Sequence, residues 1–178
     1  MADARHRTWY DHDARGRLRH TARMNTIRPY ARQDYAACLA LFDSNVPQFF
    51  DRSERAAFER FLEHDVGTWH YLVIVRAGAV VACGGHALSI DGRVASLGWG
   101  MVDRRLHRQG LGRALTEARL DACRRSTGVT RIELDTSQHT RAFYARFGFG
   151  VERVVADGYG PGLDRWDMAL DLDRLLAC

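Results

Sequence analysis

The sequence contains no lysine: the 26 residues counted as lysine or arginine are all arginine. A Walker A loop needs a lysine to hold the terminal phosphates of a nucleotide, and an enzyme that forms a Schiff base needs a lysine amine. Both classes of protein are therefore excluded before any pattern is considered.

Cysteine is scarce and is not arranged in pairs. The four cysteines, Cys38, Cys83, Cys123 and Cys178, include no Cys-x-x-Cys pair, so they predict free thiols rather than a zinc site or a disulfide framework. Long apolar runs are also missing, since no stretch reaches the ~18 residues that span a membrane, and the N-terminus lacks the apolar stretch of a signal peptide. We therefore expect a cytoplasmic protein with no metal and no membrane partner.

The excess of positive charge is confined to the N-terminus. Residues 1–23 hold six arginines against three aspartates, whereas residues 24–178 hold twenty arginines against nineteen acidic residues, which together give the formal net charge of +4. A nucleic-acid-binding domain usually carries a basic face on its folded part, so no nucleic-acid partner is expected. Residues 1–23 also lack an apolar period, which predicts a flexible basic arm followed by one domain over residues 24–178.

From Met24 onward the apolar pattern alternates between strand and helix periods. Ser53 is the expected N-cap of the second helix, and Ala77-Gly78 and Asp91-Gly92 are turn signals that predict antiparallel pairing of the strands beside them. The order of elements predicts an α/β (α+β) fold with a mixed, mostly antiparallel central sheet flanked by helices. Strands are expected at 25–30, 70–78, 79–90, 93–102, 130–137, 150–158 and 165–172, and helices at 32–45, 53–65, 111–126 and 140–148.

Two glycines, Gly110 and Gly112, stand where the third helix begins. A dinucleotide fingerprint would need a third glycine where the chain has Leu115, so that interpretation fails. A plain strand-to-helix turn remains possible. The other interpretation is a pyrophosphate site, because the first amides of a helix have no partner and glycine lets a phosphate approach them. Arginines on either side would add attraction: Arg104, Arg105, Arg108 and Arg113.

The stretch "VDRRLHRQGLGRAL" resembles the acyl-CoA signature of the GNAT N-acetyltransferase superfamily, which has the form Q/R-x-x-G-x-G/A after a strand. Gly110 and Gly112 occupy the glycine positions and Val102 the strand valine, while His107 replaces the usual glutamine or arginine. That position acts mainly through its backbone in the family. The resemblance therefore implies that phosphate binding survives this departure.

A second stretch, "TSQHTRAFYARFGFGV", resembles the family's N-x-x-A-x-x-F-Y-x-x-x-G-F segment. Phe143-Tyr144 and Gly148-Phe149 match, whereas Ser137 and Thr140 replace the usual asparagine and alanine. The likeness extends over residues 24–172. It implies a GNAT-like fold whose sheet is splayed at the CoA-binding strand, and an acetyl-CoA-dependent enzyme of the acyltransferase class that acetylates a primary amine by direct attack.

The resemblance also implies roles for individual residues. Tyr144 would be the general acid for the departing thiolate, and a backbone N–H near Gly100 or Met101 would bind the oxyanion. Gly98 and Gly100 flank Trp99, which predicts a bulge at which the pantetheine inserts. The residues expected to bind the cosubstrate are Gly100, Met101, Val102, His107, Arg108, Gln109, Gly110, Leu111, Gly112, Arg113, Ser137 and Tyr144.

The general base stays open between Glu133, Asp135, His86 and a water-relayed path, because the strand before the glycines has no glutamate. A catalytically silent acyl-CoA-binding sensor is the alternative function. Dimers are common in the family, so a homodimer is one expected assembly. The acceptor is expected between the first two helices, at Asn45, Phe49 and Phe50, and at the last hairpin loop, where the candidates are Asp157, Asp164 and Arg165.

Overall fold

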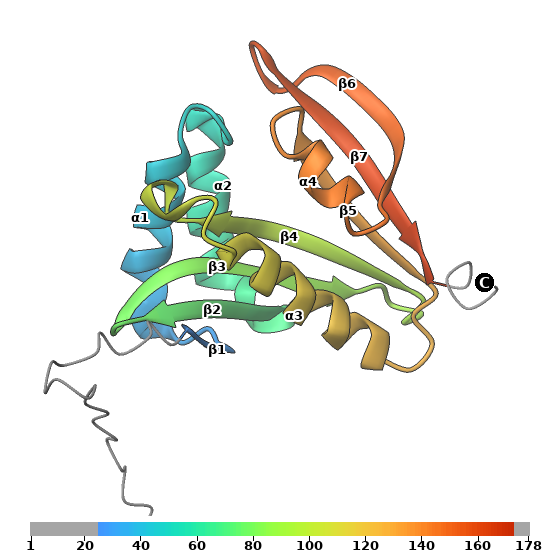
Figure 1. Cartoon of the computed structure of the whole chain (residues 1–178), viewed down its shortest axis with the longest axis horizontal. Helices are drawn as coiled ribbons and strands as arrows, with labels where there is room; N and C mark the ends of the chain where they lie inside the picture. The colour runs from blue at the N-terminus through green and yellow to red at the C-terminus, as the bar shows by residue number, and fades with distance from the viewer. Residues whose placement is uncertain (1–24, 173–178) are drawn as a thin grey trace, which may run out of the picture.

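The structure is a computed structural model, and it describes residues 25–172 (Figure 1). The expected arm over residues 1–23, the domain start at Met24 and Cys178 lie outside the described residues. The order of strands and helices is the predicted one. The elements are β1 (Asn25–Pro29), α1 (Tyr35–Asn45), α2 (Arg55–Arg60), β2 (His70–Arg76), β3 (Ala79–Leu88), β4 (Val94–Val102), α3 (Leu111–Arg125), β5 (Arg131–Ser137), α4 (Arg141–Ala145), β6 (Gly150–Gly160) and β7 (Leu163–Asp171).

Seven strands of the described part of the chain form one sheet in the order β1-β2-β3-β4-β5-β7-β6. β4 and β5 run parallel, because α3 carries the chain back between them, and the other neighbouring strands are antiparallel. The predicted mixed, mostly antiparallel sheet is confirmed. Within residues 25–172 no helix is long and apolar enough to cross a membrane.

β4 and β5 are paired over only part of their length. Val94–Leu97 pair with Arg131–Leu134, but β4 continues to Val102 and β5 to Ser137. Figure 1 shows the two strands together at one end and apart at the other. The predicted splay of the sheet is confirmed, and it leaves the facing backbone edges beyond the paired segment without a partner strand.

Two helical layers cover opposite faces of the sheet. Val73 and Ile74 are neighbours in β2 and both are fully buried, and successive strand side chains point to opposite faces. Val73 belongs to the core made with α1 and α2, whereas Ile74 packs with Leu111 and Leu115 of α3. Each such buried leucine stabilises the fold by about 1.5–3 kcal/mol, which anchors α3 against the sheet.

β4 contains a bulge at Trp99. Gly98 pairs with Gly85 and Met101 pairs with Cys83, so β4 advances by three residues where β3 advances by two. Trp99 has a φ of 49°, a left-handed conformation that is rare for a large residue, and its indole centroid lies 4.9 Å from that of Phe58 in the core of α1 and α2. The predicted bulge beside Gly100 is confirmed.

The predicted cap of the second helix is wrong. A 3-10 turn at Arg52–Glu54 precedes α2, and Asp51 caps this turn, because its Oδ1 accepts the Ser53 N–H at 2.8 Å. Ser53 lies inside the turn, and Glu54 holds the N-cap position of α2 without a side-chain bond to its first amides. Glu54 in turn accepts the Asp51 N–H at 2.7 Å. This capping box starts a short turn at Arg52–Glu54 that leads into α2. It also holds the Glu54 carboxylate against the Asp51 backbone.

The last hairpin is longer than predicted, because its strands were expected only at 150–158 and 165–172. β6 continues to Gly160 and β7 begins at Leu163. The pairing is irregular, with a shift of register between Val155 and Gly160. Asp157 takes a φ of 53°, so the hairpin absorbs its extra residues by a bend rather than by ending the strand.

Candidate active site

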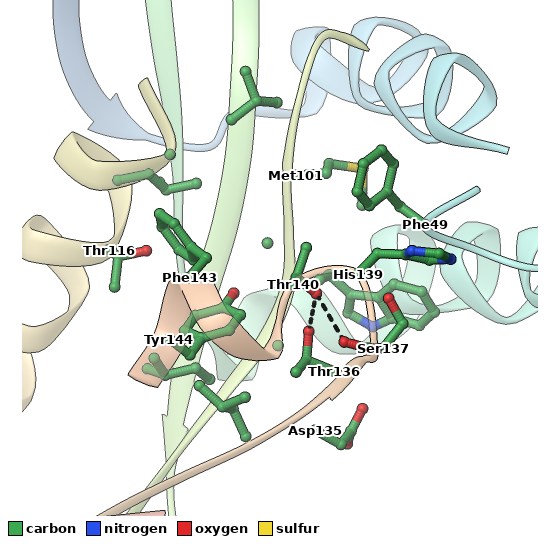
Figure 2. Close-up of a pocket in the computed structure, with 18 of the residues that line it drawn as sticks. Phe49, Met101, Thr116, Asp135, Thr136, Ser137, His139, Thr140, Phe143 and Tyr144 are labelled. Carbon is green, nitrogen blue, oxygen red and sulfur yellow. Dashed lines mark hydrogen bonds between the residues drawn. The ribbon is translucent and has the colours of Figure 1, made fainter. Parts of the chain in front are cut away.

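The separation of β4 and β5 opens a cleft of about 1590 Å³. Its walls come from both strands, the start of α3, α4, the segment between α1 and α2, and the β6–β7 hairpin. Figure 2 shows the part around α4, with Tyr144 and Phe143 on the helix and Ser137 on the adjacent strand end. The cleft brings together these predicted site residues: Gly100, Met101, Val102, His107, Arg108, Gly110, Gly112, Arg113, Glu133, Ser137 and Tyr144.

The loop that leads into α3 contains two left-handed residues. Arg108 has a φ of 62° and Gly110 a φ of 80°, and the left-handed region is uncommon for residues other than glycine. The Ala114 N–H donates to the Gly110 carbonyl at 3.0 Å, so the amides before Ala114 belong to the helix start that has no acceptor within the helix. Together with the positive end of the helix dipole, these amides could hold an anion.

The space around the glycines suits a bulky anion. A side chain added at Gly110 would meet nothing within 4 Å, and one at Gly112 would meet the Phe143 ring at 3.6 Å, an ordinary contact. Packing within the protein therefore accounts for neither glycine. The left-handed φ of Gly110 is by itself a reason for glycine at that position, whereas at Gly112 close approach of a phosphate to the amides is the remaining explanation. The pyrophosphate of an acyl-CoA fits these residues, with arginines on the same wall: Arg104, Arg108 and Arg113.

His107 is held by two neighbours. Its Nε2 lies 3.0 Å from the Val102 carbonyl oxygen, and its ring packs edge-on against Phe49 with centroids 5.2 Å apart. The Asn45 side chain donates to the same carbonyl at 2.8 Å. The imidazole therefore ties the loop before α3 to the end of β4 and to the segment between α1 and α2.

The glycines of the bulge are required by close packing. A side chain at Gly98 would lie 2.7 Å from the Trp69 ring, and one at Gly100 would lie 2.9 Å from Arg119. The Tyr71 hydroxyl donates to the Trp99 carbonyl at 3.1 Å. The backbone around Gly100, where the oxyanion donor is expected, is thus held from both faces of the sheet, and such preorganised donors are the effective ones.

Tyr144 lies in the cleft on α4 and is packed by aromatic rings. Its centroid lies 5.0 Å from that of Phe143 and 5.9 Å from that of Phe149. Among residues 25–172 its hydroxyl has no hydrogen-bond partner, although the side chain lines the cleft. At the start of α4, Thr140 bonds Thr136 and also donates to the Ser137 carbonyl at 3.4 Å (Figure 2). The phenol is therefore fixed in position while its hydroxyl is available to a ligand.

Three of the residues predicted for catalysis or for cosubstrate binding do not line the cleft. Leu111 is 1% exposed in the core beneath α3, and the Gln109 side chain accepts a hydrogen bond from Arg76 at 2.7 Å. His86 is 2% exposed and stacks on His70 at 4.7 Å. Burial, with contributions from His70 and Arg119, lowers the pKa of His86 to about 4. The structure therefore does not bring His86 to the site where a base is needed.

The other candidate bases lie in the cleft wall. Glu133 pairs with Arg131 at 2.7 Å, which engages its carboxylate. Asp135, two residues further along β5, accepts a hydrogen bond from the Tyr159 hydroxyl. Burial and Asp135 together raise the pKa of Tyr159, so this phenol is a proton donor to the carboxylate.

Sequence reasoning missed Glu54 and Tyr159, which both line the cleft. Burial raises the pKa of Glu54 to about 7, and the charges of Asp51 and Asp135 add to the effect, while the Asp51 N–H opposes it. Local spacing contains no signal for this, because Asp135 lies far from both residues in the chain. The polarity of the segment before α2 was the only available hint.

The hairpin aspartates have structural partners instead. Asp157 Oδ1 accepts the Gly162 N–H at 2.6 Å, and Asp164 Oδ1 accepts the Asp157 N–H at 3.0 Å. These two bonds close the turn between β6 and β7. Neither aspartate lines the cleft, so the expected attraction of an ammonium group by this pair is not supported by their placement.

A mixed sheet that splays between two parallel strands, with a glycine-containing helix start beside the gap, is the fold of the N-acetyltransferases. The chain belongs to the Acetyltransferase (GNAT) family, whose profile matches residues 36–149. The family uses acetyl-CoA. No curated protein sequence matches the chain.

Solved structures share the fold. The ribosomal-protein-S18-alanine N-acetyltransferase from Escherichia coli is 25% identical, with a TM-score of 0.69 over 84% of this chain and 94% of that chain. Ard1 from Thermoplasma volcanium is 20% identical, with a TM-score of 0.68 over 83% and 97% of the two chains. yncA from Salmonella typhimurium, solved with its cofactor acetyl-CoA, is 23% identical, with a TM-score of 0.66 over 84% and 95%.

Proposed function

We propose that the protein transfers the acetyl group of acetyl-CoA to a primary amine by direct attack. The observation that carries the proposal is that one cleft joins the anion site at Gly110 to the Tyr144 hydroxyl, which has no partner among the described residues. The first feature suits the phosphates of acetyl-CoA, and the second suits the sulfur at the other end of the same molecule.

Binding of acetyl-CoA would involve the amides at the start of α3 and the arginines beside them. The pantetheine would then lie between β4 and β5. Beyond Leu97 and Leu134, the backbone groups on the facing edges of these two strands have no partner strand. The donors expected to bind the oxyanion are the backbone N–H groups near Gly100 and Met101, which lie in the cleft wall. Acetyl-CoA supplies the activated thioester.

The protein's own groups would then manage two protons. The amine must lose one before it attacks the thioester carbonyl, and the thiolate must gain one as it leaves. Tyr144 is our choice for the second step, since its hydroxyl is positioned by packing and engaged by no other residue in the described range. No nucleophilic side chain is needed, which agrees with the absence of a Gly-x-Ser-x-Gly motif.

Support for an amine acceptor comes from relatives. The Escherichia coli protein is named for the alanine of ribosomal protein S18 that it acetylates, and the family as a whole consists of acetyltransferases. The identity of the acceptor of this chain is not carried over from that protein, because the two chains are only 25% identical.

The test is an amine panel with release of CoA thiol as the measurement. Turnover with any primary amine, and acetylation of its nitrogen by mass spectrometry, would support the proposal. Tight binding of acetyl-CoA by calorimetry without turnover on any amine would instead favour the alternative, a catalytically silent acyl-CoA-binding sensor.

A further inference from the structure

Three carboxylates and a tyrosine converge on the side of the cleft away from α3. Glu54 and Asp51 come from the segment before α2, Asp135 from β5 and Tyr159 from β6. Tyr159 donates to Asp135, and a side chain at Gly160 would lie 2.9 Å from the Asp51 carboxylate. The β6–β7 hairpin therefore lies against the α1–α2 segment and closes this end of the cleft, which we name the acidic chamber.

The carboxylates of the acidic chamber have no ion pair among residues 25–172. Other carboxylates of this arginine-rich chain are paired: Asp34 pairs with Arg28 at 2.6 Å, and Glu117 pairs with Arg113 at 2.7 Å. Arg165 on β7 is engaged by another carboxylate, because its Nε lies 2.9 Å from Asp167. The chamber thus retains negative charge inside a partly buried space, which is costly unless a cation from outside the chain neutralises it.

The walls beside these carboxylates are aromatic. Trp69, Trp99 and Phe50 line the same cleft, and the Phe50 and Trp99 rings stack with centroids 6.2 Å apart. The faces of such rings attract cations. Carboxylates and aromatic faces in one cavity together favour an ammonium group and disfavour a ligand carboxylate.

A buried hydroxyl points to a ligand independently of the charges. Ser137 is 3% exposed, and its Oγ has no hydrogen-bond partner among the described residues. It lines the cleft and stands two residues after Asp135 on β5, so the two side chains project from the same face of the strand. Buried hydroxyls are normally hydrogen-bonded, and an N–H donor bound in the cleft would complete this one.

We propose that the acidic chamber binds an amine acceptor that carries a second positive charge, as a diamine does, and that Glu54 accepts the proton of the attacking nitrogen. This inference rests on the proposed function for its chemical step. Asp135 holds the second ammonium group, while the first lies toward Glu54 and the thioester. Asp51 does not line the cleft and adds negative charge behind Glu54. The groups that face Glu54 are Asp51 of its own segment, Asp135 of β5 and Tyr159 of β6.

Protons and bonds are conserved in the proposed acetyl transfer. The ammonium nitrogen gives one proton to Glu54, and its lone pair forms the N–C bond to the acetyl carbonyl. The C–S bond breaks, the thiolate takes a proton from Tyr144, and the second proton of the attacking nitrogen passes through water to the Tyr144 phenolate. Glu54 returns its proton to solvent, so the products are the acetylated amine, CoA thiol and one released proton.

The first experiment measures binding, so it does not depend on turnover. The CoA complex of the full chain is titrated by calorimetry with 1,4-diaminobutane, butylamine and 4-aminobutyrate, which share a four-carbon chain and differ in charge. We expect the diamine to bind at least about tenfold more tightly than either other probe, a difference of about 1.4 kcal/mol. Equal affinity for the three probes would overturn the proposed chamber.

Substitutions locate the site. Glu54→Gln and Asp135→Asn should each weaken diamine binding about tenfold or more, with CoA affinity unchanged. The matched controls are Glu63→Gln and Asp121→Asn, whose exposed carboxylates lie outside the cleft. Retained diamine affinity in both chamber variants, with folding verified by circular dichroism, would also overturn the proposal.

The second experiment tests the proton transfer. With diaminobutane as acceptor, kcat/KM of the wild type should rise as the pH increases through about 7, and Glu54→Gln should lose this limb while Glu63→Gln keeps it. An unchanged limb in Glu54→Gln would refute the role of Glu54. Diamine binding with no thiol release from any amine would refute the proposed function and the proton step with it, whereas turnover without preference for a diamine would refute this inference alone.

Discussion

The guanidinium of Arg119 on α3 lies against the backbone of Gly100 on β4, where a methyl group would be 2.9 Å from Nη1. Arg119 is 1% exposed, its side chain makes one hydrogen bond, to Thr116 at 3.3 Å, and its Nε has no partner among the described residues. A glycine is therefore what lets α3 approach the strand that carries the expected oxyanion donor.

This contact predicts a coupling between the two positions. Gly100→Ala should lower the free energy of unfolding by about 1–3 kcal/mol, because the added methyl overlaps the guanidinium. Arg119→Met removes the overlapping group, so the double variant should recover part of that loss, as urea denaturation would measure. Gly67→Ala is the control, since a methyl group there meets nothing within 4 Å. Strictly additive effects would show that the two residues do not contact each other.

Gly112→Asp should abolish most CoA binding while the fold persists. The substitution places a negative charge beside the expected pyrophosphate, whereas the acidic side chain itself is compatible with a helix N-terminus. Calorimetry should show a loss of affinity of about 100-fold or more, equal to about 2.7 kcal/mol. Gly67→Asp adds the same charge away from the cleft and should bind CoA normally. Normal affinity in Gly112→Asp would reject the anion site.

Tyr144→Phe should lower kcat by about 10²–10⁴-fold with CoA affinity near that of the wild type. The ring is retained and the hydroxyl has no partner in the described structure, so the melting temperature should hardly change. Tyr35→Phe is the control, because its hydroxyl bonds Glu63 at 3.0 Å on the surface. A parental rate in Tyr144→Phe, with chemistry shown to be rate-limiting, would leave Tyr144 a packing residue.

Asp34 should make stability depend on pH. Its carboxylate accepts two hydrogen bonds from Arg28, at 2.6 and 2.7 Å, and these bonds are the main reason that its pKa is lowered from the ordinary 3.8. A carboxyl with a lower pKa in the folded chain contributes stability above pH 3.8, which is lost as the pH falls through its folded value.

Asp34→Asn should therefore lower the free energy of unfolding at pH 7 by about 1–3 kcal/mol, and the difference from the wild type should narrow in strong acid. Urea denaturation at several pH values measures both. Asp43→Asn removes an exposed pair with Arg55 and should cost no more than about 1 kcal/mol. A pH-independent difference for Asp34→Asn would show that the ion pair is not its cause.

Local sequence patterns were sufficient to predict the order of the elements and the part of the cleft wall formed by the start of α3 and by α4. Gly110 and Gly112 at a helix start, and Phe143-Tyr144 followed by a glycine, lie within short segments whose spacing encodes a turn and a helix face. The bulge at Trp99 was also readable, because glycines on both sides of a large residue in a strand are a local signal. These features depend on residues that are close in the chain.

Local patterns could not predict the part of the cleft wall that contains Glu54 and Tyr159. Glu54 and Tyr159 meet Asp135 only because the sheet order places β5 between β4 and β7, and no spacing within one segment encodes that neighbourhood. His86 has the polarity of a catalytic residue, but α3 buries it. Ser53 has the chemistry of a cap, yet Asp51 takes that place. The sequence by itself determined the order of the elements and the two glycines at the start of the third helix. The tertiary structure decided which distant carboxylates lie near one cavity, because burial and charge coupling depend on long-range packing.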